Sequence, residues 1–252
     1  MIEIFFLSLI QGIAEFLPVS SSSHLILVSE YLEFENRSLS IDVSLHIGSF
    51  LAVIIYFSND IKNFFKNKII FYKILLSSLP VMIVGFFLVE FNIINKIRNI
   101  ETIAWTTLIF GILLFISDKF KAEKNIYDNF DYKSVFLLGF MQVLSLVPGV
   151  SRSGIAITAA RLLKFKRTEA AKISFLISIP ILGAVSIFGL KNLLLSENTE
   201  FTKLNLLSII ISFIFSFFTI KYFLKYIEKF SLNIFVYYRV FLGLILIVLT
   251  YL

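Results

Sequence analysis

Six long apolar runs constrain this chain more than any other feature of its sequence. They fall at about 41–57, 71–90, 102–117, 171–190, 204–222 and 235–252. A run of about 20 apolar residues spans the hydrocarbon core of a bilayer as an α-helix. The mean hydropathy is +0.90 and only 16% of residues are charged, against about 25% in soluble domains. The sequence therefore predicts an all-α integral membrane protein with six transmembrane helices, and it excludes a disordered chain, a nucleic-acid-binding domain and a disulfide scaffold.

Two further apolar segments, about 2–32 and 135–163, are interrupted in the middle by proline and serine. The interruptions read LPVSSSSH at residues 17–24 and PGVSRSG at residues 148–154. Proline ends a helix, and serine offers the backbone local hydrogen bonds. Irregular backbone at membrane depth survives only where it is buried in protein or lines a wet cavity. Each segment therefore predicts a re-entrant helical hairpin with its tip inside the protein.

The two halves of the chain resemble each other at an offset of 131 residues. The offset pairs polar residues at the two interruptions: Gln11 with Gln142, Ser20 with Ser151, and Ser22 with Ser153. Each half would contain one hairpin and three crossings, so the second half would enter the membrane upside down. We expect a single membrane domain over 1–252, made of two inverted repeats at about 1–120 and 132–252.

The positive charges are distributed unevenly over the predicted loops. Of 23 Lys and Arg residues, 16 fall in loops assigned to one face and five in loops assigned to the other. The remaining two, Arg152 and Arg239, lie in apolar surroundings. Because cytoplasmic loops carry an excess of Lys and Arg, the first face is predicted to be cytoplasmic and both termini to lie outside.

Three ionisable residues, Glu15, His24 and Arg152, lie at the two helix interruptions. Embedded ionisable residues are costly and usually functional. If the hairpin tips meet, they combine a carboxylate, an imidazole, a guanidinium, several hydroxyls and the backbone N–H groups of helix N-termini. Guanidinium forks and helix N-termini suit phosphate oxygens, and a carboxylate suits a hard divalent cation. This pattern favours a phosphate-handling site.

Residues 11–24 and 148–154 resemble the two signature motifs of bacterial undecaprenyl-diphosphate phosphatases of the bacitracin-resistance type. The first motif is an acid or Gln, then x-x-x-Glu, running into Pro-Val-Ser-Ser and a His; the second is Pro-Gly-x-Ser-Arg-Ser-x-x-Thr. Length, helix count and motif positions fit over essentially the whole chain. In two departures, Ala156 replaces the motif Thr, with Thr158 the nearest hydroxyl, and Gln11 stands where many members carry Glu.

The resemblance implies hydrolysis of undecaprenyl diphosphate to undecaprenyl phosphate and inorganic phosphate. This reaction recycles the lipid carrier for peptidoglycan and cell-wall synthesis, supports cell shape, and gives bacitracin resistance. It further implies a divalent cation, Mg²⁺ or Ca²⁺, and a multi-pass protein of the bacterial cytoplasmic (inner) membrane whose active site opens toward the outer, periplasmic face. The expected partners are a polyprenyl diphosphate and the bilayer, with no nucleic acid, and a homodimer is compatible with the sequence.

Side-chain chemistry then suggests roles for the motif residues. Arg152 would clamp the phosphates, and Glu15 would hold the metal or position water, with Gln11 as a second, neutral ligand. The nucleophile stays open between Ser21 activated by His24, His24 itself, and a metal-bound water. The remaining motif positions are expected to bind substrate: Gln11, Ser20, Ser22, Gly149, Ser151, Ser153 and Gly154.

A membrane transporter or lipid flippase is the alternative, because an inverted repeat with broken helices suits alternating access equally well. The content of the hairpin tips separates the two functions, since a transporter for a neutral solute needs no nucleophile. The sequence also lacks the Lys-x(6)-Arg-Pro motif of the membrane acid phosphatases.

Overall fold

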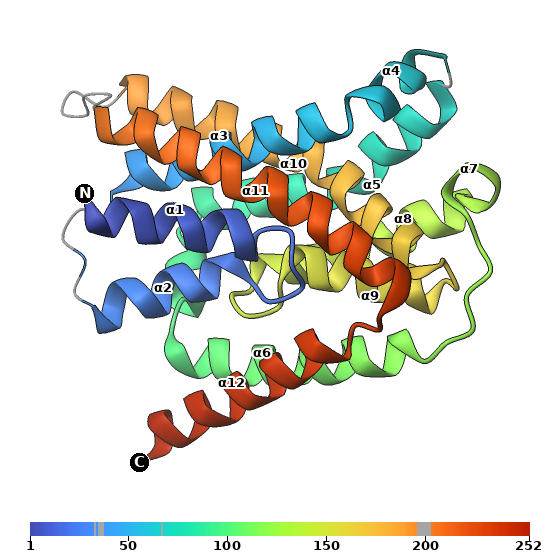
Figure 1. Cartoon of the computed structure of the whole chain (residues 1–252). Helices are drawn as coiled ribbons and strands as arrows, with labels where there is room; N and C mark the ends of the chain where they lie inside the picture. Colours follow the sequence, from blue (N-terminus) through green and yellow to red (C-terminus); the bar gives the residue numbers. More distant parts are fainter. Residues whose placement is uncertain (33, 35–37, 67, 196–202) are drawn as a thin grey trace.

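The computed structural model describes residues 1–32, 34, 38–66, 68–195 and 203–252. Arg37, one of the five charges assigned to the outer face, lies outside these ranges. Apart from one isolated bridge between Lys124 and Phe165, every element of the described ranges is helical. The elements, shown in Figure 1, are α1 (Ile2–Ala14), α2 (Ser21–Tyr31), α3 (Leu39–Tyr56), α4 (Ser58–Lys66), α5 (Lys68–Glu90), η1 (Ile94–Ile97), α6 (Ile100–Asp118), α7 (Ile126–Asn129), α8 (Tyr132–Val143), η2 (Leu144–Leu146), α9 (Arg152–Leu162), α10 (Arg167–Leu195), α11 (Lys203–Lys229) and α12 (Asn233–Tyr251).

Six helices are long and apolar enough to cross a membrane, namely α3, α5, α6, α10, α11 and α12, which confirms the predicted number. They differ in how far the protein itself covers them: the apolar window of α10 is 56% buried, whereas that of α12 is 22% buried. Helix α10 is therefore the central crossing, and α12 presents most of its apolar side chains to the surroundings. This protein is a multi-pass membrane protein.

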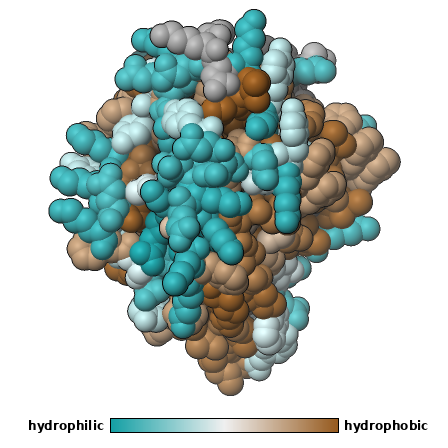
Figure 2. Space-filling view, turned by 90° about the vertical axis from the view of Figure 1, so that its right-hand side faces the viewer, coloured by the Kyte–Doolittle hydropathy of each residue, from teal (hydrophilic) through white to brown (hydrophobic). Residues whose placement is uncertain are grey.

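The end of the molecule that carries α4 and α7 is more polar than its flanks. Figure 2 shows hydrophilic side chains gathered over the centre of this face, with apolar surface to its right and below. Behind the face, the buried Asp118 at the end of α6 accepts hydrogen bonds from Arg161 of α9 and Arg167 of α10. This ion-pair cluster ties the far end of α9 to two membrane helices.

Both segments that the sequence predicts as interrupted are broken at the expected places. Helix α1 ends at Ala14 and α2 begins at Ser21, while α8 and η2 are separated from α9 by residues 147–151. The residue before each second helix is a serine with positive φ, 74° at Ser20 and 72° at Ser151. A positive φ is uncommon outside glycine, and such residues cluster at functional sites. Its recurrence at an offset of 131 agrees with an internal repeat, which stays a prediction.

The two turns lie near the middle of the molecule, between the long helices (Figure 1). Helix α1 packs on α11, and α8 packs on α5, so each hairpin contacts a crossing from the other half of the chain. Glycine makes the approach close: a Cβ at Gly12 would lie 2.6 Å from the Cβ of Phe215, and one at Gly139 would lie 3.0 Å from the Ser77 carbonyl oxygen. This packing holds the first helix of each hairpin closely against a crossing from the other half.

Candidate active site

Glu15, in the turn after α1, is the centre at which the two hairpins meet. Its Oε2 accepts hydrogen bonds from the Ser21 hydroxyl at 2.5 Å and from the Gln11 amide at 3.0 Å. Its Oε1 pairs with the guanidinium of Arg152, which belongs to the second hairpin. Glu15 is 7% exposed, so these contacts replace water around a buried carboxylate. The structure thus brings together four of the residues singled out from the sequence.

Ser21 and Arg152 hold the same carboxylate from equivalent positions. Each is the first residue of its helix, α2 or α9, and the two are 131 positions apart. The N-terminus of a helix carries a partial positive charge and free N–H groups, which favour anions. Two such ends flank Glu15, and the Arg152 side chain retains 17% of its exposure. The arrangement can therefore accept an anionic group beside the carboxylate.

His24 turns away from the Glu15 cluster. Its Nδ1 lies 2.7 Å from the Ser20 carbonyl oxygen, and its Nε2 contacts the hydroxyl of Tyr238 on α12. The two rings stack with centroids 5.7 Å apart. A carbonyl can only accept a hydrogen bond, so Nδ1 carries the proton and Nε2 accepts from Tyr238. The carboxylate of Glu15, and not His24, is the base in contact with Ser21 in this structure.

The other serines of the tips tie the turns together. Ser20 contacts the hydroxyl of Ser22 at 3.3 Å, and Ser151 contacts that of Ser153 at 3.2 Å, again at equivalent positions. The Ser153 hydroxyl also donates to the Leu17 carbonyl at 2.6 Å, which joins the second hairpin to the first. Among these serines Ser22 is the exposed one, so it is the hydroxyl that an entering ligand would meet.

The two glycines of the second motif serve close packing. Gly149 has φ +92°, and a Cβ there would lie 2.8 Å from the Ile103 carbonyl oxygen of α6. A Cβ at Gly154 would lie 2.9 Å from the guanidinium of Arg239. The Gly154 N–H is occupied by the Ser151 hydroxyl at 3.1 Å. In this structure both glycines therefore let α6 and α12 approach the tip.

Sequence reasoning missed Tyr238 and left Arg239 without a role. Tyr238 is one of ten tyrosines and stands outside both motifs, so no sequence signal marked it. Arg239 is fully buried in α12, where it donates hydrogen bonds to the carbonyls of Pro18 and Gly149. Its signal was present, because an arginine in an apolar crossing is costly.

Known proteins resemble this chain over nearly its whole length. The family model described as Bacitracin resistance protein BacA matches residues 4–245. The chain belongs to this family. It is similar to Undecaprenyl-diphosphatase of Pelagibacter ubique (strain HTCC1062), with 47% identity over 251 residues that cover 99% of this chain and 98% of the relative.

In this BacA-family chain the position of the missing motif threonine is buried. Ala156 is 1% exposed in α9, and Thr158 two residues on is equally buried, so the nearest hydroxyl to the motif position is not exposed. Within the described ranges, no group of three or more His, Cys, Asp or Glu side chains could hold a metal ion. Beside Glu15, however, the buried Oε1 of Gln11 has no hydrogen-bond partner among the residues that the structure describes. It offers one more oxygen ligand next to the carboxylate.

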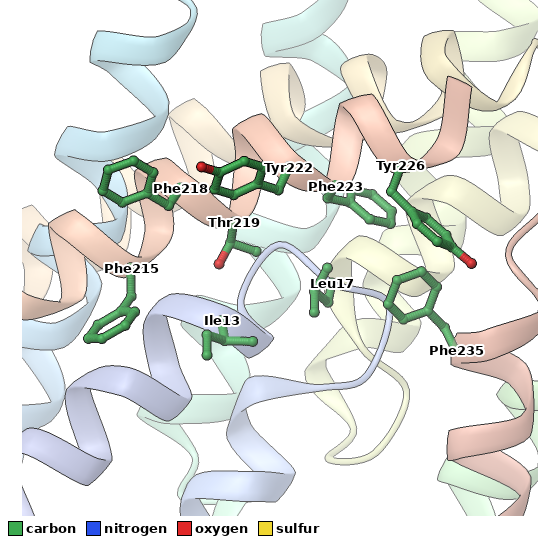
Figure 3. A pocket seen from close by; sticks show the side chains of 9 residues that line it. All are labelled: Ile13, Leu17, Phe215, Phe218, Thr219, Tyr222, Phe223, Tyr226 and Phe235. Carbon is green, nitrogen blue, oxygen red and sulfur yellow. The ribbon is translucent and has the colours of Figure 1, made fainter. Parts of the chain in front are cut away.

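An apolar groove of about 370 Å³ runs beside the first hairpin tip of the BacA-family chain. Figure 3 shows its aromatic side chains on α11 facing Ile13 and Leu17, with Phe235 of α12 closing one end. Leu17 links the groove to the site, because its carbonyl accepts the Ser153 hydroxyl. A second groove of about 490 Å³ lies between α5 and α8 and is lined by apolar residues such as Leu79 and Leu144.

Proposed function

We propose that this protein hydrolyses undecaprenyl diphosphate to undecaprenyl phosphate and inorganic phosphate at the meeting point of its two hairpin tips. Membership of the BacA family and 47% identity to a curated undecaprenyl-diphosphatase support this activity. The single observation that carries it is the Glu15 carboxylate shared between a hydroxyl and a guanidinium. In the cell the reaction recycles the lipid carrier for wall synthesis and gives bacitracin resistance.

In the first step the Ser21 oxygen attacks the terminal phosphorus of the diphosphate. Glu15 Oε2, 2.5 Å away, takes the hydroxyl proton as the new Ser–O–P bond forms. The bond between the terminal phosphorus and the bridging oxygen breaks, and undecaprenyl phosphate leaves with that oxygen, which takes up the proton from Glu15 and so restores the carboxylate. Glu15 is suited to this role because it is within hydrogen-bond reach of the hydroxyl before the substrate arrives.

Arg152 supplies the complementary charge. Before the substrate arrives it pairs with Glu15, so its guanidinium already lies beside the proposed reacting centre. A diphosphate offers pairs of oxygens that match the guanidinium fork better than a single carboxylate oxygen does. The exchange of Arg152 from Glu15 to the phosphates also frees the carboxylate to act as a base.

In the second step water hydrolyses the phosphoserine. Glu15 takes a proton from the attacking water, the Ser–O–P bond breaks, and Ser21 recovers its proton as inorganic phosphate is released. His24 fits a supporting role better than a nucleophilic one, because both of its ring nitrogens are engaged. An acid-stable phosphorylated intermediate would support Ser21, whereas an acid-labile one would identify His24, and the absence of any intermediate would favour direct attack by water.

The residues around Glu15 fit a divalent cation, Mg²⁺ or Ca²⁺, that arrives with the diphosphate. Glu15 and the unpartnered Oε1 of Gln11 would hold it, while phosphate oxygens and water supply the other ligands that hard cations accept. When bound, such a cation neutralises negative charge on the diphosphate. Glu15→Gln should raise the cation concentration required for binding of a non-hydrolysable diphosphate.

We place the protein in the bacterial cytoplasmic membrane, with the site open to the outer face. The 16-to-5 distribution of positive charges supports this orientation. The chain has no cysteine, so single cysteines report cleanly. A membrane-impermeant thiol reagent added to intact cells should label Lys96→Cys and spare Lys62→Cys, both at exposed positions. Labelling of Lys62→Cys and not of Lys96→Cys would show that the protein has the opposite orientation.

The first groove is suited to the prenyl chain of the substrate, because it is apolar and reaches the tip through Leu17. Thr219→Trp, which fills this groove, should raise the KM for undecaprenyl diphosphate but not for a short prenyl diphosphate. Leu79→Trp fills the second groove and is the matched control. Equal effects of both variants on both substrates would remove the first groove from the substrate path.

The activity itself is tested by phosphate release from undecaprenyl diphosphate by the purified protein, with and without a chelator. Release that depends on a divalent cation supports the proposal. Lipid movement in vesicles without any phosphate release would instead identify a flippase, which neither the family match nor the identity of the relative favours.

A further inference from the structure

Arg239 joins three separate segments through their main chain. Its Nη1 donates to the Pro18 carbonyl at 3.2 Å, its Nη2 to the Gly149 carbonyl at 2.8 Å, and its Nε to the Thr107 carbonyl at 3.3 Å. Pro18 belongs to the first tip, Gly149 to the second, and Thr107 to α6. One fully buried side chain thus connects both tips to a membrane helix.

The neighbours of Arg239 are shaped around its side chain. A Cβ at Gly111 of α6 would lie 2.9 Å from the Cβ of Arg239, and one at Gly154 of α9 would lie 2.9 Å from its Nη1. Larger residues at these two positions would displace the stem or the guanidinium. The course of the side chain from α12 to the tips therefore depends on glycine at both its base and its end.

The charge of Arg239 is not balanced by a carboxylate. Within the described ranges no acidic side chain forms an ion pair with it, whereas Arg152 is paired with Glu15. The tips together therefore carry one buried positive charge in excess before the substrate arrives. A buried charge is costly unless it is paired or hydrogen-bonded, and an entering diphosphate supplies the missing negative charge nearby.

We propose that Arg239 is the positioning residue of the site: it fixes the two hairpin tips relative to each other, and so sets Ser21 against Arg152, while its charge favours a diphosphate. The proposal rests on the proposed function. In this proposal Arg239 acts through the tips, because each of its three guanidinium nitrogens donates to a main-chain carbonyl, and it does not itself contact the reacting phosphorus.

Two substitutions separate the effect of the hydrogen bonds of Arg239 to the two tips from the effect of its charge. Arg239→Lys keeps the charge, but a single ammonium cannot hold carbonyls on three segments. It should lower kcat about 10²-fold, the cost of a misplacement near 1 Å, and leave KM within about threefold. Arg239→Met removes both functions and should also raise KM. Normal kcat in a folded Arg239→Lys protein would overturn the proposal that Arg239 positions the two tips.

The matched control is Arg161→Lys. Arg161 is also buried and donates to the carbonyls of Asp118, Phe120 and Phe165, but it lies at the far end of α9. It should lower thermal stability without changing the ratio of kcat to KM. If both lysine variants lose kcat alike at equal loss of stability, Arg239 is merely structural.

A second test leaves the guanidinium chemistry intact. Gly111→Ala places a methyl group against the stem of Arg239 and should lower kcat in the same sense as Arg239→Lys, by a smaller factor. Gly183→Ala in α10, where the added Cβ would meet only the Phe50 ring at 3.2 Å, is the control and should keep its kcat. A normal kcat in Gly111→Ala would count against the proposal.

The closing experiment measures the distance between the hairpins by spin labels at Ile13→Cys and Leu144→Cys, positions 131 residues apart in a chain without cysteine. Arg239→Lys should shift or broaden the distance distribution, and Arg161→Lys should not. An unchanged distribution in Arg239→Lys would overturn the inference. Because this readout needs no substrate, it is independent of the proposed activity, whose failure would show as absent phosphate release by the unsubstituted protein.

Discussion

The two hairpin tips have a similar backbone conformation but carry different side chains. Both end a broken helix, both turn through a serine with positive φ, and both begin a helix of 11 residues. At an offset of 131 residues, however, the tips carry different side chains: Leu146 corresponds to Glu15, Arg152 to Ser21, and Ile155 to His24. In the proposed mechanism the first tip supplies the base, Glu15, and the nucleophile, Ser21, and the second tip supplies the guanidinium of Arg152.

This difference explains why two tips of similar backbone can form one proposed site instead of two. Two identical tips would place two carboxylates together, where one must take up a proton, or two guanidinium groups, which repel each other. Different residues at these three pairs of positions make the tips complementary, so that Ser21 and Arg152 contact the two oxygens of the same carboxylate. Substitutions at each of these contacts test this account of the two tips.

The largest loss is expected from Glu15→Gln, because both tips converge on this side chain. Removal of a positioned general base costs about 10²–10⁴ in rate, and the neutral amide also leaves Arg152 without its partner. The measurement is kcat for phosphate release by the purified protein. Glu90→Gln, at an exposed position near the end of α5, is the control, and near-normal turnover by Glu15→Gln would assign Glu15 to structure.

Arg152→Lys is expected to cause the second largest loss, on the order of 10²–10³ in kcat, which is the usual cost of losing one preorganised donor. Lysine keeps the charge of the second tip but loses the fork that matches phosphate oxygens. An arginine that merely reaches for the membrane interface would tolerate lysine. Full activity at normal expression would therefore remove Arg152 from the site.

Ser153→Ala tests the hydrogen bond that joins the tips directly. Its hydroxyl donates to the Leu17 carbonyl at 2.6 Å, so its loss removes this direct link between the tips, while the same carbonyl still accepts the Val19 N–H at 2.8 Å. A penalty of about 1.4 kcal/mol corresponds to about a tenfold loss in kcat if the tips separate. For the equivalent residue, Ser22, the described part of the chain shows a hydroxyl contact with Ser20 of its own tip and none with the other tip, so Ser22→Ala should be milder. A reversed order would contradict the assigned roles.

Tyr238→Phe sharpens the role of His24. It removes the hydrogen bond to Nε2 and keeps the stacked rings, so kcat should fall by only about threefold. Tyr237→Phe, at an exposed neighbouring position, should be neutral. If Tyr238→Phe abolished turnover, His24 would have to take part in the chemistry.

Asp131→Ala should have the smallest effect, on stability alone. Asp131 caps α8, the entry to the second hairpin, whereas Met1 gives α1 no side-chain cap. Loss of such a cap costs about 1 kcal/mol, measured as a lower Tm at unchanged kcat. Hydrogen bonds from the Ser134 hydroxyl and N–H lower the pKa of Asp131 below its usual value, so this stabilisation is present near neutral pH and is lost as the pH falls through that lowered pKa.

The sequence predicted the crossings, the two helix interruptions and the convergence of Glu15 with Arg152, because embedded charge and proline are visible in the order of residues. It paired Ser21 with His24, since the two lie three positions apart, but the turn directs Ser21 to Glu15 instead. The side-chain partner of His24, Tyr238, is 214 residues away in the sequence. The acceptors of Arg239 are backbone carbonyls, which carry no side-chain signal at all.

The central claim is that Glu15 and Arg152 act as one unit across the two tips. A double-mutant cycle in kcat, with Glu15→Gln, Arg152→Lys and the double variant, tests it most directly. Residues that act as a unit are strongly non-additive, so the double variant should be about as slow as the slower single variant. A loss of kcat in the double variant equal to the product of the two single losses would contradict the account.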